Sequence, residues 1–146
     1  MIVSLEPGGS IYFFGKSPPK GIGLGGRVDV PIKWGFGLAA GYASAFVRSA
    51  TLPMVTHHPY GSIVYRIDDL PYIIPWAEVG AGVVILVATE RPLVQTLTAG
   101  HVGAGLDFAV GIFIVGFGLR YHAYLETQTF PSGMTLWLRL GFRFLE

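Results

Sequence analysis

The segment RYHAYLE, Arg120 to Glu126, holds the side chains that come closest to a catalytic pattern in this chain. A histidine such as His122 can act as general base for a serine nucleophile when the two lie within hydrogen-bonding reach. The segment contains no serine, so the nucleophile would have to come from another strand, with Ser44 and Ser62 as candidates. We therefore expect His122 to have a structural role, and we expect no catalytic residue in this chain.

Two adjacent histidines, His57 and His58, could suggest a metal site. Neighbouring residues of an extended chain point to opposite sides, and no cysteine or acidic residue lies nearby to complete a set of ligands. We expect both side chains to contact solvent in a long loop at Ser49 to Pro59. We expect neither a metal ion nor another cofactor.

The chain is too apolar for an ordinary soluble domain. Of its 146 residues, 51% are hydrophobic and 13% are charged, with a net charge of +1 and a mean hydropathy of +0.54. About a quarter of the residues are charged in a soluble domain. A membrane-spanning helix needs about 20 apolar residues in a row, and the best windows are interrupted by Pro75, Glu78 or Arg120. We therefore expect strands whose apolar face contacts something other than water.

Large apolar residues recur at every second position in segments of about 9 to 13 residues, with small, polar or charged residues between them. In LWLRLGFRF, Leu136 to Phe144, leucine and phenylalanine alternate with Trp137, Arg139, Gly141 and Arg143. Such alternation predicts strands with one apolar face. The other expected strands are Ser10 to Phe14, Gly21 to Val30, Phe36 to Arg48, Ser62 to Ile67, Trp76 to Val87, Gly100 to Phe108 and Phe113 to Leu125.

These segments predict an all-β fold, an eight-stranded antiparallel up-and-down transmembrane β-barrel that spans residues 1–146 as a single domain. Short connections are expected near Trp34, at Asp68 to Pro71 and at Ala109 to Gly111, and longer ones at 15–20, 49–59, 88–98 and 126–133. Outer-membrane barrels have short periplasmic turns and longer external loops. Both termini are therefore expected in the periplasm. We interpret Met1 as an added start, and Leu145 and Glu146 as residues of cloning origin.

Aromatic residues gather at two levels of the expected barrel, as in the girdles that bound the apolar band of membrane barrels. A soluble sandwich or a lipocalin-like barrel is the alternative, but it would place the large residues inside and leave a bare surface of glycine, alanine and charge. The short-turn girdle is expected to contain Trp34, Phe36, Tyr72, Trp76, Phe108, Phe113, Phe142 and Phe144, and the long-loop girdle Tyr42, Phe46, Tyr60, Tyr121, Tyr124 and Phe130.

Most charged residues within the expected strands fall on the face opposite the large apolar residues. An arginine facing lipid near the midplane costs about 2–4 kcal/mol, so we expect these charges in the lumen. Eight strands enclose only enough room for side chains, and buried charges must be paired. We therefore expect a closed lumen, with Arg27, Glu78 and Arg139 near one level and inward glycines making room; a small-ligand cavity is the alternative. The expected network is Arg27, Asp29, Arg66, Glu78, Asp107, Arg120, Arg139 and Arg143.

The eight alternating segments and the final Phe144 resemble the small outer-membrane barrels of Gram-negative bacteria, of the OmpA and OmpX kind. Leu138, Leu140, Phe142 and Phe144 resemble the C-terminal signal read by the outer-membrane assembly machinery. The resemblance implies a monomeric barrel integral to the outer membrane, with that machinery and outer-membrane lipids or lipopolysaccharide as partners. The fold alone does not carry a function, so we expect, from the closed and salt-bridged lumen, a structural, surface or lipid-interacting role. A narrow pore for ions or small solutes is the alternative. Nucleic-acid binding is not expected, because the basic residues form no exposed patch.

The segment RYHAYLE also loosely resembles the histidine-containing strand of the lipid A deacylases called PagL, which are barrels of the same size. In that family a serine follows the histidine by two positions, whereas this chain has Tyr124 there. The resemblance implies a lipid-modifying enzyme as a further alternative, but the nucleophile is missing from its place.

The assignment of the two faces predicts the effects of two neighbouring substitutions. Leu140→Arg places a charge toward lipid, whereas Arg139→Leu places an apolar side chain in the lumen. We expect Leu140→Arg to reduce insertion into vesicles more than Arg139→Leu does. Equal assembly of the two variants would contradict the assignment.

Overall fold

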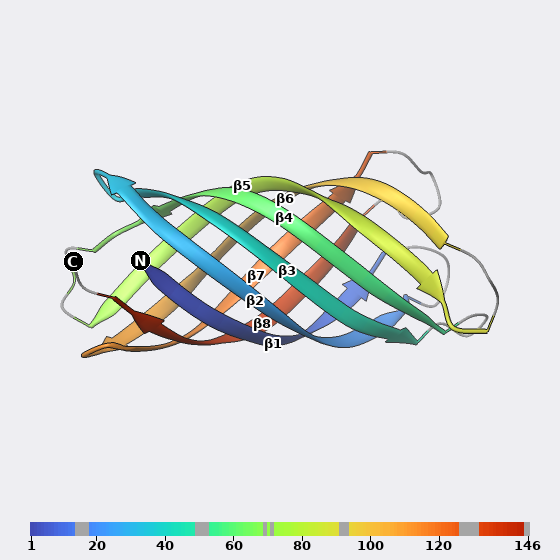
Figure 1. The fold of residues 1–146 in the computed structure, drawn as a ribbon, viewed down its shortest axis with the longest axis horizontal. Helices are drawn as coiled ribbons and strands as arrows, with labels where there is room; N and C mark the ends of the chain where they lie inside the picture. The colour runs from blue at the N-terminus through green and yellow to red at the C-terminus, as the bar shows by residue number, and fades with distance from the viewer. Residues whose placement is uncertain are drawn as a thin grey trace.

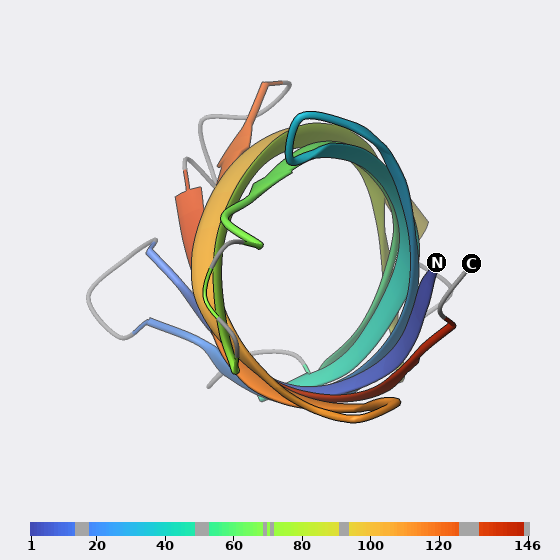
Figure 2. The same ribbon diagram turned by 90° about the vertical axis from the view of Figure 1, so that its left-hand side faces the viewer.

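Eight strands form one closed antiparallel sheet in the computed structural model, which describes residues 1–13, 18–48, 53–68, 70, 72–90, 94–125 and 132–144. Each strand pairs with its neighbours in chain order, and the first pairs with the last (Figures 1 and 2). The predicted eight-stranded barrel is confirmed. No helix in the described part of the chain could cross a membrane. The strands are β1 (Ile2–Tyr12), β2 (Lys20–Lys33), β3 (Phe36–Arg48), β4 (Met54–Arg66), β5 (Ile73–Ala88), β6 (Val94–Val110), β7 (Phe113–Tyr124) and β8 (Ser132–Arg143).

The beginning of β1 and the end of β8 lie together at one end of the barrel (Figure 1). At the same end, Trp34 and Gly35 join β2 to β3 with φ angles of 54° and 79°. Positive φ at both central residues defines the type I′ turn, whose twist matches that of paired strands. Gly111, with a φ of 61°, begins the turn from β6 to β7. Two of the predicted short connections are thus confirmed as tight turns. Leu145 and Glu146 lie outside the described residues.

The first strand begins earlier than the sequence pattern predicted. β1 starts at Ile2, so the prediction of a strand limited to Ser10–Phe14 was wrong, and Phe14 itself lies outside the described residues. The segment Pro7 to Gly9 continues the strand instead of breaking it. The bridges from β1 to β8 skip Glu6 and Pro7, which accommodates a proline that has no N–H to donate.

The strands also reach further into the longer connections than predicted. β4 begins at Met54 and not at Ser62, so the loop expected at Ser49 to Pro59 was wrong and the segment THHPY belongs to a strand. Bridges from β4 to β5 skip His58 and Pro59, which again accommodates a proline inside a ladder. β6 and β8 likewise begin before the positions that the pattern indicated.

The two faces of the strands alternate as predicted. In β8, Leu138 and Leu140 are 59% and 51% exposed on the outside, whereas Trp137 and Arg139 are 3% and 0% exposed in the lumen. Large apolar side chains also cover the outside of the other strands. The soluble alternative, with large residues inside and small or charged residues outside, is therefore wrong for the described strands.

Three aromatic residues that were expected in the girdles lie in the lumen. Trp76, Tyr60 and Tyr124 are 4%, 6% and 9% exposed, because each falls on the inward positions of its strand. Phe130 lies outside the described residues. The remaining expected girdle residues are exposed: Trp34, Phe36, Tyr72, Phe108, Phe113, Phe142 and Phe144 in one group, and Tyr42, Phe46 and Tyr121 in the other.

Candidate functional site in the barrel lumen

Arg27 on β2 lies at the centre of the first group of buried ion pairs. Its Nε donates to Asp29 Oδ1 at 2.8 Å, and its Nη1 donates to Glu78 Oε2 at 2.6 Å. Arg66 Nη2 lies 2.9 Å from the same oxygen of Asp29. Arg120 Nε donates to Glu78 Oε1 at 2.7 Å. Two carboxylates thus connect arginines from β2, β4 and β7 across the lumen.

Arg139 on β8 forms the second group. Its Nη2 donates to Glu6 Oε1 at 3.0 Å, and its Nη1 donates to Asp107 Oδ2 at 2.8 Å. The other oxygen of each carboxylate accepts a hydrogen bond from an aromatic side chain. The Tyr60 hydroxyl donates to Glu6 Oε2 and Trp76 Nε1 donates to Asp107 Oδ1, both at 3.1 Å. All four carboxylate oxygens of this group therefore have partners.

The ion pairs join as many cations as anions. None of these side chains is more than 5% exposed, so each charge depends on its partners in place of water. The formal charges of the network cancel. Its members are Arg27, Arg66, Arg120 and Arg139 with Glu6, Asp29, Glu78 and Asp107.

The structure brings seven of the eight expected charged residues into these pairs. Arg143 is the exception: it has no ion pair within the described ranges, and with Arg66 and Asp68 it lines a cavity of about 230 Å³ at the end that holds the chain termini. Arg139 bonds to Glu6 and Asp107, and not to Glu78, which was expected near its level.

Sequence reasoning missed Glu6, because the first strand was expected to begin after it. The signal was present in the first six residues, where Ile2, Ser4 and Glu6 are buried and Val3 and Leu5 are exposed. The segment Pro7 to Gly9 hid this alternation.

Aromatic rings fill the lumen beside the ion pairs. The Arg120 guanidinium carbon lies 4.2 Å from the ring centroid of Tyr60 and 4.4 Å from that of Trp137. Trp76 stacks on Trp137 with centroids 5.9 Å apart. Both indoles occupy space left by Gly118, where a Cβ would lie 2.6 Å from Trp76 and 2.8 Å from Trp137. The inward glycine is therefore needed for these rings to pack.

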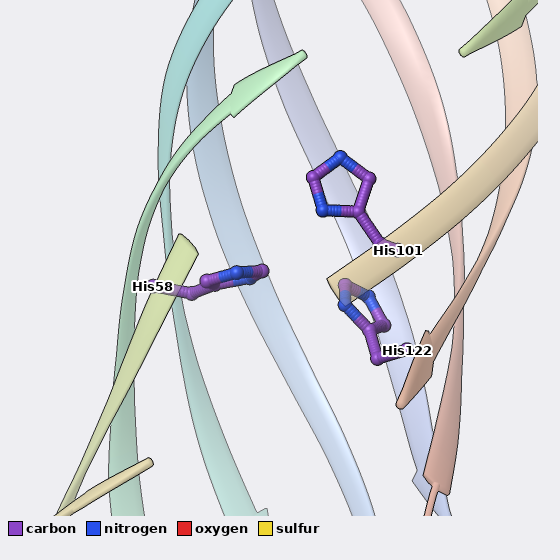
Figure 3. A group of neighbouring side chains, drawn as sticks. All are labelled: His58, His101 and His122. Atoms are coloured by element: carbon purple, nitrogen blue, oxygen red, sulfur yellow. The ribbon is translucent and has the colours of Figure 1, made fainter. Parts of the chain in front are cut away.

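Three histidines form a separate layer of the lumen (Figure 3). His58 on β4 lies across from His101 on β6 and His122 on β7 (Figure 3), and one ring nitrogen from each lies within 4.8 Å of one from the others. The ring centroids are 5.1 Å apart for His58 and His122, 5.8 Å for His101 and His122, and 6.2 Å for His58 and His101. All three are buried.

The position of the histidine layer follows from the last three inward residues of β7, which are Arg120, His122 and Tyr124 in order. Arg120 belongs to the ion pairs. Tyr124 belongs to a buried apolar cluster toward the end with the longer connections. The histidines therefore lie between the ion pairs and the apolar cluster, whose members are Tyr12, Val47, Val84, Leu86, Leu97, Ala99 and Tyr124.

Two hydroxyl groups hold the histidine rings. Ser62 Oγ lies 2.8 Å from His101 Nε2, and Thr135 Oγ1 lies 3.2 Å from His122 Nε2. The pair of Ser62 and His101 has the distance of a nucleophile and its general base. The other nitrogen of His101, Nδ1, is buried and has no hydrogen-bond partner in the described part of the chain. The pair therefore lacks the carboxylate that would orient the imidazole in a triad.

The expectation that both His57 and His58 lie in a solvent-exposed loop was wrong. Both belong to β4, and only His57 points outward, where its Nδ1 lies 2.5 Å from the Tyr42 hydroxyl. The two residues do point apart, as expected of an extended chain. His58 nevertheless meets histidines from β6 and β7, a proximity that depends on strand register and cannot be read from sequence spacing.

No protein-family model matches the chain, and no curated protein matches it significantly. Solved structures with a similar fold include Neisserial surface protein A, at a TM-score of 0.80 and 14% identity over 97% of this chain and 94% of the other. The N-terminal barrel domain of Pseudomonas aeruginosa OprF has a TM-score of 0.67 and 19% identity, over 98% of this chain and 97% of the other. The outer membrane enzyme PagL has a TM-score of 0.61 and 19% identity, over 99% of this chain and 100% of the other. The chain therefore has the fold of the small eight-stranded outer-membrane barrels, as the resemblance in its sequence implied.

The geometry around Arg139 predicts a large loss of stability when its charge is removed. Arg139→Met leaves Glu6 and Asp107 buried without their cation, and we expect the free energy of unfolding to fall by about 3–5 kcal/mol. Adding Glu6→Gln and Asp107→Asn removes the uncompensated charges, so we expect the triple variant to recover part of the loss.

Urea unfolding in detergent, followed by the difference in gel migration between folded and boiled protein, measures these changes. Arg143→Met is the matched control, because Arg143 has no ion pair among the described residues. A stability of Arg139→Met equal to that of Arg143→Met would contradict the role of the network.

Proposed function

We propose that this chain is an integral outer-membrane protein with a closed lumen, and that its role is structural or involves the cell surface or membrane lipids, without catalysis. One observation carries the proposal: buried ion pairs occupy the inner faces of seven of the eight strands, and large apolar side chains cover the outer faces of the described strands. The ion pairs are buried inside, and large apolar side chains are exposed outside. An exposed apolar surface that encircles the barrel requires a lipid environment.

The outer surface fits a bilayer in its details. Exposed aromatic residues lie toward both ends of the barrel, including Trp34 and Phe142 at one end and Phe46 and Tyr121 at the other. Rings with a polar edge are favoured at membrane interfaces. The proposed orientation places the termini and tight turns in the periplasm and the longer connections outside. Outer-membrane lipids, including lipopolysaccharide, are then the partners of the outer surface, and the barrel acts as a monomer.

The last strand offers the proposed contact with the assembly machinery. Leu138, Leu140, Phe142 and Phe144 form one exposed row on β8 and just after it. The same strand pairs with β1 to close the barrel, so its recognition and the closure of the sheet involve the same segment.

The closed lumen distinguishes this proposal from a pore. Two cavities lined by inward residues such as Glu6 and Arg120 measure only about 40 and 50 Å³, enough for a few water molecules. The ion pairs and the stacked rings of Trp76 and Trp137 lie across the rest of the cross-section of the lumen.

Planar-bilayer recording tests whether the lumen is closed. We expect no persistent unitary conductance from the inserted protein, because moving an ion through the lumen requires breaking buried ion pairs. A conducting porin in the same bilayers serves as the positive control, and the heat-dependent gel shift shows that the protein is folded. Reproducible unitary steps at constant voltage would favour the pore.

A lipid-modifying enzyme is the second candidate, favoured by the 2.8 Å distance between Ser62 and His101. Two features weigh against it. Both residues are buried in the lumen, away from the lipid-facing surface where an acyl chain would arrive. His122, which aligns with the loose resemblance to PagL, also points inward and contacts Thr135.

Mass spectrometry of lipid A from cells that overproduce the protein tests for catalysis. We expect the acylation profile to equal that of cells producing the Ser62→Ala variant, since within the described ranges no acid is hydrogen-bonded to His101 Nδ1. A lost acyl chain that reappears with Ser62→Ala would establish the enzyme and contradict the proposal.

A further inference from the structure

The histidine layer contains three buried ring nitrogens that have no hydrogen-bond partner within the described residues: His58 Nε2, His101 Nδ1 and His122 Nδ1. Each ring contributes one of them. A buried polar atom without a hydrogen-bond partner destabilises the fold, so three in one cluster need an explanation. We infer that His58, His101 and His122 together bind one divalent transition-metal ion, with Zn²⁺ as the representative ion.

The second nitrogens of two rings support this assignment. His101 Nε2 contacts Ser62 and His122 Nε2 contacts Thr135, so the Nδ1 atoms of both rings remain for a metal. Histidines that bind metals usually hydrogen-bond through the nitrogen that does not contact the ion, which fixes the orientation of the ring. Ser62 and Thr135 are thus positioning residues for the site.

The strand between the ligands leaves room for the ion. β5 separates β4 from β6, and its inward residues at this level are glycines. A Cβ at Gly80 would lie 2.6 Å from His101 Nε2, and one at Gly82 would lie 2.8 Å from His58 Nε2. Larger residues at these positions would occupy the space of the two rings, so the glycines allow histidines from non-adjacent strands to meet.

The separations in the cluster suit a site that contracts around an ion. Zinc–nitrogen bonds of about 2.0–2.1 Å place two ligands of one tetrahedral ion roughly 3.4 Å apart, while one ring nitrogen of each histidine here lies within 4.8 Å of one from each of the others. Each ring therefore needs to move by about 1 Å, by rotation about its side-chain bonds. A cavity of about 50 Å³ borders His58 and His122, and it can admit a water molecule as fourth ligand.

The ligand set determines the class of ion. Three imidazoles without a carboxylate or thiolate favour Zn²⁺, Cu²⁺, Ni²⁺ or Co²⁺ over Mg²⁺ and Ca²⁺, which prefer oxygen ligands. The nearest cation of the ion-pair network, Arg120, is already bonded to Glu78 at 2.7 Å. The ion would add two positive charges to a formally neutral lumen. Strong bonds to the three imidazoles must offset the cost of this uncompensated charge, so only a metal that binds imidazole strongly can occupy the site.

Equilibrium dialysis of the refolded protein against Zn²⁺ tests the site, with elemental analysis of the bound metal. The protein must carry no histidine tag. We expect about one ion per barrel, and at least a tenfold weaker affinity for each of His58→Gln, His101→Gln and His122→Gln. Ser62→Ala and Thr135→Val should weaken binding by about tenfold as well, through the loss of ring positioning.

His57→Gln is the matched control, since His57 neighbours His58 on β4 but points out of the barrel. We expect it to bind as the unaltered protein does. The heat-dependent gel shift shows that each variant has folded. Visible absorption of the Co²⁺ complex of the unaltered protein gives an independent test, because it reports whether the bound ion is tetrahedral. Binding far below one ion per barrel, an octahedral Co²⁺ spectrum, or equal loss with His57→Gln would overturn the inference. None of these results would alter the proposal of a closed outer-membrane barrel.

Discussion

The pairing of every buried charge in the lumen is the condition on which this barrel depends. Four arginines and four carboxylates lie inside a sheet whose outer surface is apolar, so neither group can reach bulk water through the wall. One uncompensated buried charge costs about 3–5 kcal/mol, which is a large share of the 5–15 kcal/mol that typically stabilises a protein. The positions of the strands must therefore satisfy all the pairs at once.

This condition explains the composition of the inner face. Arginine side chains and two stacked tryptophans can share a narrow lumen only where the facing residues are small. Gly103 faces Glu78 and Gly118 faces the two indoles. The same use of glycine on β5 brings the three histidines together. The ion pairs, the histidine layer and the apolar cluster then follow one another along the barrel.

The alternation of apolar and polar residues is a local property of the sequence. The features of the fold that depend on this alternation could therefore be predicted from the sequence. The faces of LWLRLGFRF, the strand number and the burial of seven of the eight charged residues expected in the lumen agree with the structure. Two strand starts were missed because Pro7 and Pro59 suggested breaks, whereas the ladders only skip bridges there. Partners could not be predicted, because the contacts of Arg139 with Glu6 and of His58 with His122 depend on the register of eight strands. Spacing along one chain does not supply that register.

The most direct test of a dry, ion-paired lumen is the exchange of arginine Nε protons with water, measured by NMR in detergent micelles or nanodiscs. The Nε groups of Arg27, Arg120 and Arg139 donate to Asp29, Glu78 and Glu6, respectively. We predict that these three protons exchange slowly and give separate, persistent signals, whereas that of Arg143 exchanges rapidly. Rapid exchange of all four would show a hydrated lumen and would contradict the account.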